Sequence, residues 1–315
     1  MQSTTARSNP ATMGVLMGVG AYSLWGLFPA FWPLLAPAGA VEILAHRVAW
    51  TLVVTALLAL LLGRWSVLRR LPARGWLLAS SAAALIAVNW GTYIYGVNSD
   101  QVVETALGYF INPLVSVLLG VLVLRERLRR AQLVALVVAG AAVVVLTIDY
   151  GRVPVIALTL AFTFGGYGLI KKLIPLDSLS SLTAESTVLG PLAVGYVVWL
   201  EATGAGTFTD AGVGHVLLMI ATGPVTTVPL LLFGAAARRV PLVTIGLLQY
   251  LTPTLQFAWG VLVNHEPMPP SRWIGFGLVW IGLVVFATDG VRAARRSRRA
   301  TGEAREQAPT PTAGQ

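Results

Sequence analysis

Polar side chains recur on one face of each of two apolar segments, and their chemistry suits hydrogen bonding rather than reaction. The first stripe consists of Tyr109, Asn112, Ser116 and Gly120. The second stripe, 140 positions later, consists of Gln249, Thr252, Gln256 and Gly260. Spacings of three, four and four residues place each set on one face of an α-helix. The stripes predict a shared central cavity, although small and polar residues also hold packed membrane helices together.

Two prolines interrupt the stripes at equivalent points, Pro113 and Pro253. A proline removes a backbone donor and frees a carbonyl one turn back, so a helix that contains it bends. In transporters, interrupted helices at equivalent points of two halves mark the binding site. Gly108 permits close approach of a neighbouring backbone near the first kink. We expect Gly108, Pro113 and Pro253 to form the hinge, with a kink that only improves packing as the alternative.

Another apolar segment adds amide and aromatic groups to the proposed cavity. Asn89 and Tyr93 are four residues apart and share a helix face, with Trp90 beside them. Trp90 and Tyr93 lie too deep in the segment to be simple interfacial anchors. We expect Trp90, Tyr93 and Tyr250 to form aromatic walls suited to a small amphipathic molecule.

Ionisable residues gather near the ends of the apolar segments. Glu42 and His46 are four residues apart, Arg47 follows them, and Glu104 begins the segment with the first stripe. We predict that these four residues form a charged network at the outer side of a membrane. Glu42 and His46 could also shuttle protons, because histidine titrates near neutral pH. No carboxylate lies clearly at mid-membrane, so the sequence assigns no coupling ion.

The composition places these residues in a membrane protein. With 56% hydrophobic and 11% charged residues, the 315-residue chain carries more apolar surface than one soluble core could hide. Ten stretches approach the ~20-residue length that crosses a bilayer. They are Met13–Leu35, Glu42–Leu62, Trp76–Gly96, Val103–Leu124, Ala131–Ile148, Val153–Ile170, Leu182–Leu200, Gly214–Phe233, Pro241–Val263 and Trp273–Ala287. The sequence therefore predicts an all-α membrane protein with ten transmembrane helices.

The shift of 140 positions also relates residues outside the stripes, which indicates two copies of one unit. It carries Gly26 to Gly166, Leu122 to Leu262 and Glu126 to Glu266. Five spans in each copy is an odd number, so the second copy is inverted in the membrane, as in many secondary transporters. We predict repeats over residues 13–148 and 153–289, a disordered N-terminus over 1–12 and a basic, disordered tail over 291–315.

Basic residues set the predicted orientation, because Lys and Arg stay on the cytoplasmic side during insertion. With the N-terminus inside, all but Arg47, Arg152 and Arg272 of the 22 Lys and Arg lie in inner segments. Both termini are therefore predicted to be cytoplasmic. The net charge of +9 then reflects topology and attraction to anionic lipids of the bilayer at the inner face. We expect no nucleic-acid partner, since a basic run after a span is an ordinary anchor.

Missing residue types narrow the range of functions. The chain has no cysteine, which excludes disulfides, thiol nucleophiles and cysteine-based metal sites. His46, His215 and His265 lie far apart in sequence, and no metalloprotease or serine-hydrolase string occurs. We expect no catalytic residue, no metal and no other cofactor. A membrane-embedded enzyme is the main rival class, and a non-transporting sensor or assembly factor that uses the same cavity is the second.

Several short motifs occur together along the chain. They are Glu42-Ile43-Leu44-Ala45-His46-Arg47, Asn89-Trp90, Gly108-Tyr109-Phe110-Ile111-Asn112-Pro113 and Arg125-Glu126-Arg127-Leu128. Over residues 13–290 the chain resembles RarD-type proteins of the EamA family, within the drug/metabolite transporter superfamily. The resemblance implies two inverted repeats, a bacterial inner-membrane location and a cavity lined by helices 1, 3, 4, 6, 8 and 9. It also implies a permease with a link to chloramphenicol sensitivity.

The two copies differ after their fourth helices, where only Glu126 and Glu266 correspond. We expect these carboxylates to cap backbone donors of the loop and helix that follow each of them. The main hypothesis is a secondary transporter that exports a small amphipathic metabolite or drug by rocking one repeat against the other. The substrate itself, the coupling ion and the oligomeric state, including a homodimer, stay open.

Overall fold

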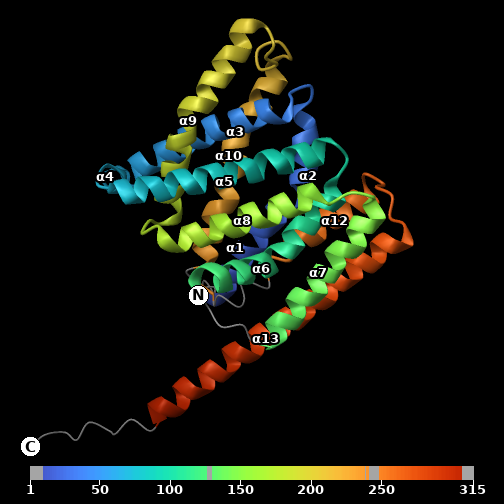
Figure 1. The fold of residues 1–315 in the computed structure, drawn as a ribbon. Helices are drawn as coiled ribbons and strands as arrows, with labels where there is room; N and C mark the ends of the chain where they lie inside the picture. Colours follow the sequence, from blue (N-terminus) through green and yellow to red (C-terminus); the bar gives the residue numbers. More distant parts are fainter. Residues whose placement is uncertain (1–9, 126–129, 238, 241–247, 307–315) are drawn as a thin grey trace, which may run out of the picture.

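All regular structure in the described part of the chain is helical. The computed structural model describes residues 10–125, 130–237, 239–240 and 248–306. The first half contains α1 (Pro10–Gly26), α2 (Phe28–Phe31), the 3₁₀ helix η1 (Trp32–Leu35), α3 (Ala40–Leu61), α4 (Trp65–Arg69), α5 (Ala73–Asn98), α6 (Val102–Leu124) and α7 (Arg130–Tyr150). The second half contains α8 (Val155–Leu173), α9 (Ser178–Thr203), α10 (Val213–Ala237), α12 (Leu251–Leu262) and α13 (Pro270–Glu306) (Figure 1).

Seven of the described helices are long and apolar enough to cross a membrane: α3, α5, α6, α7, α9, α10 and α13. α1 and the segment that follows it, Phe28–Leu35, are together also long and apolar enough to cross a membrane, with a bend of 44° between them. Counted as one span, this pair raises the number of candidate spans to eight. Large apolar side chains on these helices face outward, including Leu61, Ile148 and Leu192, each more than 70% exposed. Lipid rather than water suits such a surface. The predicted all-α, multi-pass membrane class is confirmed, and the number of ten spans stays a prediction.

The remaining predicted spans correspond to shorter helices. α8 is apolar over Val155–Lys171 but falls below the length of a full span. The predicted span Pro241–Val263 contains α12, while its residues 241–247 lie outside the described residues.

The C-terminal tail differs from the prediction of disorder, because α13 continues as a helix to Glu306. Ala and Arg, which are frequent there, are strong helix formers.

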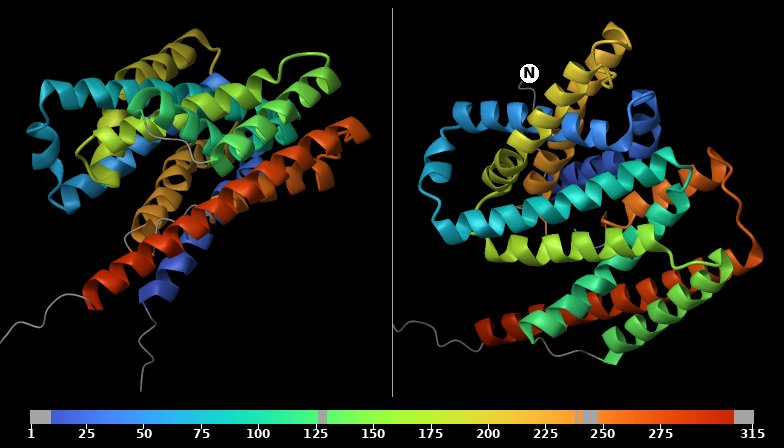
Figure 2. Two further views of the ribbon diagram at one scale, coloured as in Figure 1. Left: turned by 60° about the horizontal axis from the view of Figure 1, so that its bottom comes forward. Right: turned by 45° about the horizontal axis from the view of Figure 1, so that its top comes forward.

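Helices of the two halves pack mainly against each other. α1 contacts α10 and α12, whereas α8 contacts α5 and α6. α3 packs on α9 and α10, and α6 packs on α12. α7 and α13 lie side by side at the edge of the molecule, as all three views show (Figures 1 and 2). Neither half forms a separate bundle, so any cavity in the middle is bounded by both.

The largest apolar cluster fixes α6 and α7 to α12 and α13. Its aromatic centre consists of Phe110, Phe257 and Phe276, with the rings of Phe257 and Phe276 4.7 Å apart between centroids, and the ring of Trp280 contacts all three. Lipid tails are as apolar as these side chains, so close packing rather than water exclusion stabilises such an interface. The cluster holds the two stripe-bearing helices together on the side away from α3 and α9.

The two predicted hinge prolines occupy different positions. Pro113 lies inside α6, which continues through it. Pro253 lies in the first turn of α12, where the missing N–H would have no helical partner. We expected both prolines to lie in mid-helix. In the described elements Pro113 does so, whereas Pro253 lies at a helix start. Their role as a hinge stays a prediction.

Gly108 lets α6 and α8 approach each other closely. A Cβ atom at Gly108 would lie 2.7 Å from the carbonyl oxygen of Ala157 and 2.9 Å from the Cβ of Leu160. Both distances are shorter than non-bonded contacts allow, and one neighbour is backbone, which cannot rotate away. Only glycine therefore permits this contact between the first and second halves.

Replacement of Gly108 by alanine should destabilise the protein. We expect Gly108→Ala to lower the free energy of unfolding by about 1–3 kcal/mol, as overpacking typically does. Gly140→Ala is the matched control, because a Cβ at that helical position meets no atom within 4 Å. Thermal unfolding of both variants in detergent measures the difference. A Gly108→Ala variant as stable as Gly140→Ala would contradict the packing described.

Candidate functional site

A cavity of about 430 Å³ lies between the two halves. Its volume falls within the range of about 300–1,000 Å³ typical of small-molecule sites. The cavity is lined by residues of α1, α5, α6, α8, α10 and α12. These six helices correspond to helices 1, 3, 4, 6, 8 and 9, which the family resemblance implied. α3 and α9 also contribute, so the cavity touches nearly every helix of the central bundle.

Eight of the residues predicted to bind a solute line this cavity. They are Asn89, Trp90, Tyr93, Tyr109, Asn112, Gln249, Thr252 and Gln256. Ser116 and Tyr250 are not among the described lining residues. Ser116 is exposed on α6 one turn beyond Asn112, because the helix extends past the end of the cavity. Tyr250 packs instead against the apolar cluster around Phe257.

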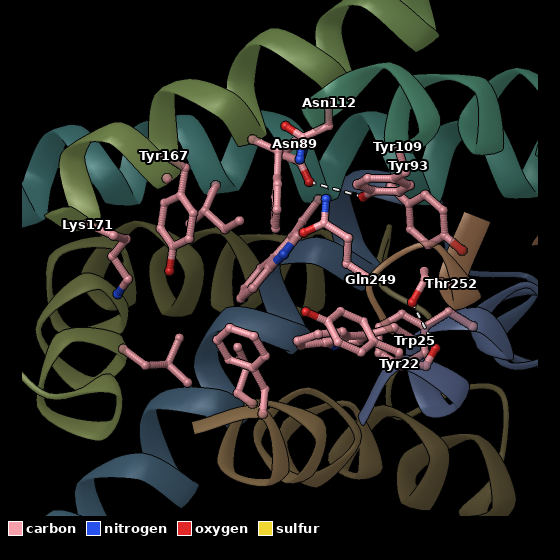
Figure 3. Close-up of a pocket in the computed structure, with 18 of the residues that line it drawn as sticks. Tyr22, Trp25, Asn89, Tyr93, Tyr109, Asn112, Tyr167, Lys171, Gln249 and Thr252 are labelled. Carbon is pink, nitrogen blue, oxygen red and sulfur yellow. Dashed lines mark hydrogen bonds between the residues drawn. The ribbon is translucent and has the colours of Figure 1, made fainter. Parts of the chain in front are cut away.

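Asn89 joins three helices through hydrogen bonds. Its Nδ2 donates to the carbonyl oxygen of Leu160 and to the hydroxyl of Thr163, both at 3.0 Å. The hydroxyl of Tyr109 donates to Asn89 Oδ1 at 3.2 Å (Figure 3). α5 is thereby bound to α6 and α8. With both ends of its amide paired, Asn89 positions Tyr109 and holds the wall of the cavity together.

Gln256 and Thr252 connect α12 to the first half. Gln256 Nε2 donates to the carbonyl oxygen of Trp25 at 3.1 Å and to the hydroxyl of Tyr93 at 2.9 Å. The hydroxyl of Thr252 donates to the carbonyl oxygen of Tyr22 at 2.8 Å (Figure 3). The pairing of the Gln256 amide is incomplete, because its Oε1 is buried without a hydrogen-bond partner.

Asn112 also has an unsatisfied acceptor. Its Oδ1 is buried without a partner, and the residue lines the cavity (Figure 3). A buried polar atom without a hydrogen bond is costly, and native proteins contain few of them. Two amide oxygens, on Asn112 and Gln256, are therefore able to accept hydrogen bonds from a solute.

Aromatic side chains form the walls. Tyr22, Trp25 and Phe233 contact one another on one wall, with ring centroids 5.4–6.0 Å apart. Tyr93, Tyr109, Phe164 and Tyr167 form a second chain of ring contacts along another wall. Sequence reasoning missed the aromatic residues of α1, α8 and α10. Pairs three residues apart in mid-span, Tyr22 with Trp25 and Phe164 with Tyr167, were the available signal.

Arg47 lies in this cavity rather than in an outer network. Its side chain is only 3% exposed, and its Nε donates to the hydroxyl of Thr226 at 2.9 Å. The guanidinium carbon lies 3.8 Å from the ring centroid of Trp90 and 4.9 Å from that of Trp32. Its Nη1 is buried without a hydrogen-bond partner. Arg47 therefore supplies a cation to the wall of the cavity.

The four residues predicted to form one charged network belong to separate clusters. Glu42 accepts hydrogen bonds from the backbone N–H and the hydroxyl of Thr207, and the ring of His46 stacks on Phe208 at 4.6 Å. Residues 46 and 47 are about 100° apart around a helix. His46 therefore faces the segment between α9 and α10, while Arg47 faces the cavity.

Glu104 has partners of its own. It forms an ion pair with Arg152 at 2.8 Å and accepts a hydrogen bond from the backbone N–H of Ile156 at 3.0 Å. Both contacts bind the start of α6 to the segment that opens α8. No contact joins Glu104 to Arg47 in the described part of the chain, because the two side chains point to different neighbours.

Lys171 lines the cavity near α9 and has a neutralising partner. Its Nζ lies 2.5 Å from Glu185 Oε1, and the hydroxyl of Tyr167 donates to Glu185 Oε2 at 3.0 Å. Lys171 and Tyr167 lie toward one end of the cavity, and Tyr93 and Tyr109 lie toward the other (Figure 3). The charge of this lysine is thus compensated within the protein.

Asp177 caps α9 near the same end. Its carboxylate accepts hydrogen bonds from the backbone N–H groups of Leu179 and Ser180 at 3.1 and 3.2 Å. Partial burial alone would raise the pKa of Asp177, but the hydrogen bonds from Ser180 and Leu179 and the charge of Arg64 outweigh it and lower the pKa. Arg64 lies 3.8 Å away, so the cap also links the two halves.

Glu266 forms a cap, but on a helix other than the one predicted. Its carboxylate accepts the backbone N–H groups of Val102 and Val103, at 2.7 and 3.0 Å, and so caps α6 of the first half. Burial raises the pKa of Glu266, although these two bonds favour the carboxylate. The sequence predicted a cap on the following loop and helix, because spacing alone does not reveal an inter-half contact. Glu126 lies outside the described residues.

The charged residues do not form a metal site in the described part of the chain. No group of three or more His, Asp or Glu side chains there is close enough to hold an ion. Glu42, Glu104 and Glu185 instead pair with hydroxyl, backbone or oppositely charged groups.

Comparison with known proteins places this architecture in a family. Residues 12–148 match the EamA-like transporter family. The chain is 56% identical to Protein RarD of Streptomyces exfoliatus over 96% of each chain. It is 41% identical to the uncharacterised transporter YojE of Bacillus subtilis, over 90% of this chain and 97% of that one.

A solved structure, described only as the crystal structure of a protein, has the same fold. The TM-score is 0.59 at 18% identity, over 86% of this chain and 96% of the other. At this identity the likeness concerns the fold alone. The two sequence relatives, in contrast, are similar over almost their full length, and one of them is named a transporter. The chain is therefore a membrane transporter rather than an enzyme, and it belongs to the RarD-type proteins of the EamA family.

Proposed function

We propose that this protein is a secondary transporter that moves a small amphipathic organic solute through the cavity between its halves. The observation that carries the proposal is the pair of unpartnered amide oxygens on Asn112 and Gln256, one from each half, in a cavity with aromatic walls. Aromatic rings suit an apolar body, and the two acceptors suit a hydrogen-bond donor. Tyr93, Tyr109, Gln249 and Thr252 complete the proposed site.

The proposed architecture has ten spans in two inverted repeats, over residues 13–148 and 153–289. The packing supports it, because the shift of 140 positions turns the contact of α1 with α10 into that of α8 with α5. It likewise turns the contact of α1 with α12 into that of α8 with α6. A two-fold relation between the halves would produce such matched pairs.

We place both termini in the cytoplasm and the protein in the bacterial inner membrane, following the distribution of basic residues. In this orientation the outer ends of the halves are joined by Glu266 to α6, by Asp149 to Arg272 at 3.1 Å and by Glu42 to Thr207. The cavity meanwhile reaches Lys171 and Ser178 at the inner end. The structure then represents a state closed toward the outside.

Export of a drug or metabolite is the proposed direction, and chloramphenicol is a suitable first probe. A relative from Pseudomonas aeruginosa is named chloramphenicol-sensitive protein RarD. Chloramphenicol carries an aromatic ring and hydroxyl and amide donors, which match the walls and acceptors of the cavity. Anionic lipids at the basic inner face are the proposed membrane partner.

Loss of either acceptor should weaken transport. We expect Asn112→Ala and Gln256→Ala each to reduce the kcat/KM for solute flux in proteoliposomes by about three- to tenfold, as loss of one hydrogen bond does. Labelled chloramphenicol and a panel of aromatic solutes serve as probes. Ser116→Ala is the control, because this side chain lies on α6 but outside the cavity. Wild-type flux in both cavity variants would refute the site.

The inverted topology is testable because the chain contains no native cysteine. Arg70 and Asp210 are exposed and differ by 140 positions, so they occupy equivalent places in the two repeats. We expect a membrane-impermeant maleimide to label Asp210→Cys in intact cells and to label Arg70→Cys only after permeabilisation. The cysteine-free parent controls for background. Labelling of both positions from the same side would contradict the inversion.

A further inference from the structure

The cavity contains one cation that the protein leaves without a counter-charge. Arg47 is buried, and the structure shows no carboxylate within ion-pair distance of it in the described residues. Its Nε bonds to the neutral hydroxyl of Thr226, and its Nη1 has no partner. Buried charges are normally paired, since an isolated ion is far less stable in a low-dielectric interior than in water.

The other charges of the cavity do not satisfy Arg47. Among the described residues, the lining includes Arg47 and Lys171 but no Asp or Glu. Lys171 already has Glu185 as its partner at 2.5 Å. The excess positive charge of the lining is therefore located at Arg47, and a ligand that entered the cavity would meet it there.

Aromatic contacts hold the guanidinium without neutralising it. The guanidinium carbon lies over the ring of Trp90, 3.8 Å from its centroid, and 4.9 and 5.6 Å from the centroids of Trp32 and Phe28. Stacking of this kind fixes the plane of an arginine and leaves its edge free for hydrogen bonds. A planar carboxylate is the group that best matches such an edge.

We infer that the transported solute carries a carboxylate, which binds the free edge of Arg47, and an apolar body that packs on the surrounding aromatic side chains. This inference rests on the proposed function, since it names the chemical class of solute for the same cavity. One cation and no lining carboxylate favour a monoanion over a cation or a dianion. Asn112 and Gln256 would accept a hydrogen bond from a donor elsewhere on the solute.

Binding of matched probes to the purified full-length protein in lipid nanodiscs tests the inference. The probes are 3-phenylpropanoate, 3-phenylpropanamide and 3-phenylpropylamine, which share one apolar body and differ in charge. Isothermal titration should show that the carboxylate binds at least about tenfold more tightly than the amide, as expected of a charge-assisted hydrogen bond. The amine should bind most weakly of the three.

Two pairs of variants assign that preference to Arg47. Arg47→Gln should abolish the advantage of the carboxylate, whereas Arg70→Gln, which removes an exposed arginine outside the cavity, should retain it. Thr226→Asp keeps Arg47 but places a carboxylate against its Nε, so the preference should again disappear. Thr226→Asn offers an uncharged acceptor at the same place and separates the effect of charge from that of shape. Thermal unfolding confirms that each variant is folded.

The inference is wrong if the carboxylate and the amide bind equally, if the carboxylate does not bind, or if its advantage survives both Arg47→Gln and Thr226→Asp. These results remain distinct from failure of the proposed function. Flux of neutral solutes that is sensitive to Asn112→Ala, without any preference for a carboxylate, would overturn the inference and leave the transport site in place. Flux insensitive to Asn112→Ala and Gln256→Ala would overturn the site itself.

Discussion

Inside a bilayer a polar side chain has no water to pair with, and this constraint explains how the central helices are arranged. Asn89 joins α5 to α6 and α8, while Gln256 and Thr252 join α12 to α1 and α5. Most of these bonds fix a helix of one half to a helix of the other. The bond from Tyr109 to Asn89 instead positions a side chain in the cavity wall. In the cavity this pairing is incomplete, at Asn112, Gln256 and Arg47. The hydrogen bonds that join the helices and the groups proposed to bind a solute are thus parts of one network.

The interlocked packing of the halves determines how such a network could move. α1 and α8 each lie mainly against helices of the opposite half, so neither half can shift without changing the walls of the cavity. Contacts between the halves at the proposed outer end include polar ones, such as the cap of α6 by Glu266. Hydrogen bonds of this kind exchange readily with water, whereas the aromatic cluster around Phe257 does not. In the proposed cycle the polar contacts separate while the apolar cluster stays packed.

Helical spacing predicted much of the site, because residues three or four apart share a face whatever the tertiary structure. It identified Tyr109, Asn112, Thr252 and Gln256, all of which line the cavity. Spacing predicts which side chains share a helix face but not how far along that face a cavity extends. Ser116 is on the same stripe but lies outside the cavity. Hydropathy predicted the helical membrane class for a similar reason, since it depends on composition alone.

The direction of a charged side chain could not be predicted in the same way. Arg47 follows His46 in sequence, and only the positions of Thr226 and Trp90 show that it turns into the cavity. Glu266 caps a helix that begins more than 160 residues earlier, a contact that no local pattern encodes. The most direct measurement uses the cysteine-free chain with Gln249→Cys and a membrane-impermeant thiol reagent applied to right-side-out and inverted vesicles. A transport site reached alternately from both sides predicts labelling in both preparations, whereas labelling from one side only, or from neither, would contradict it.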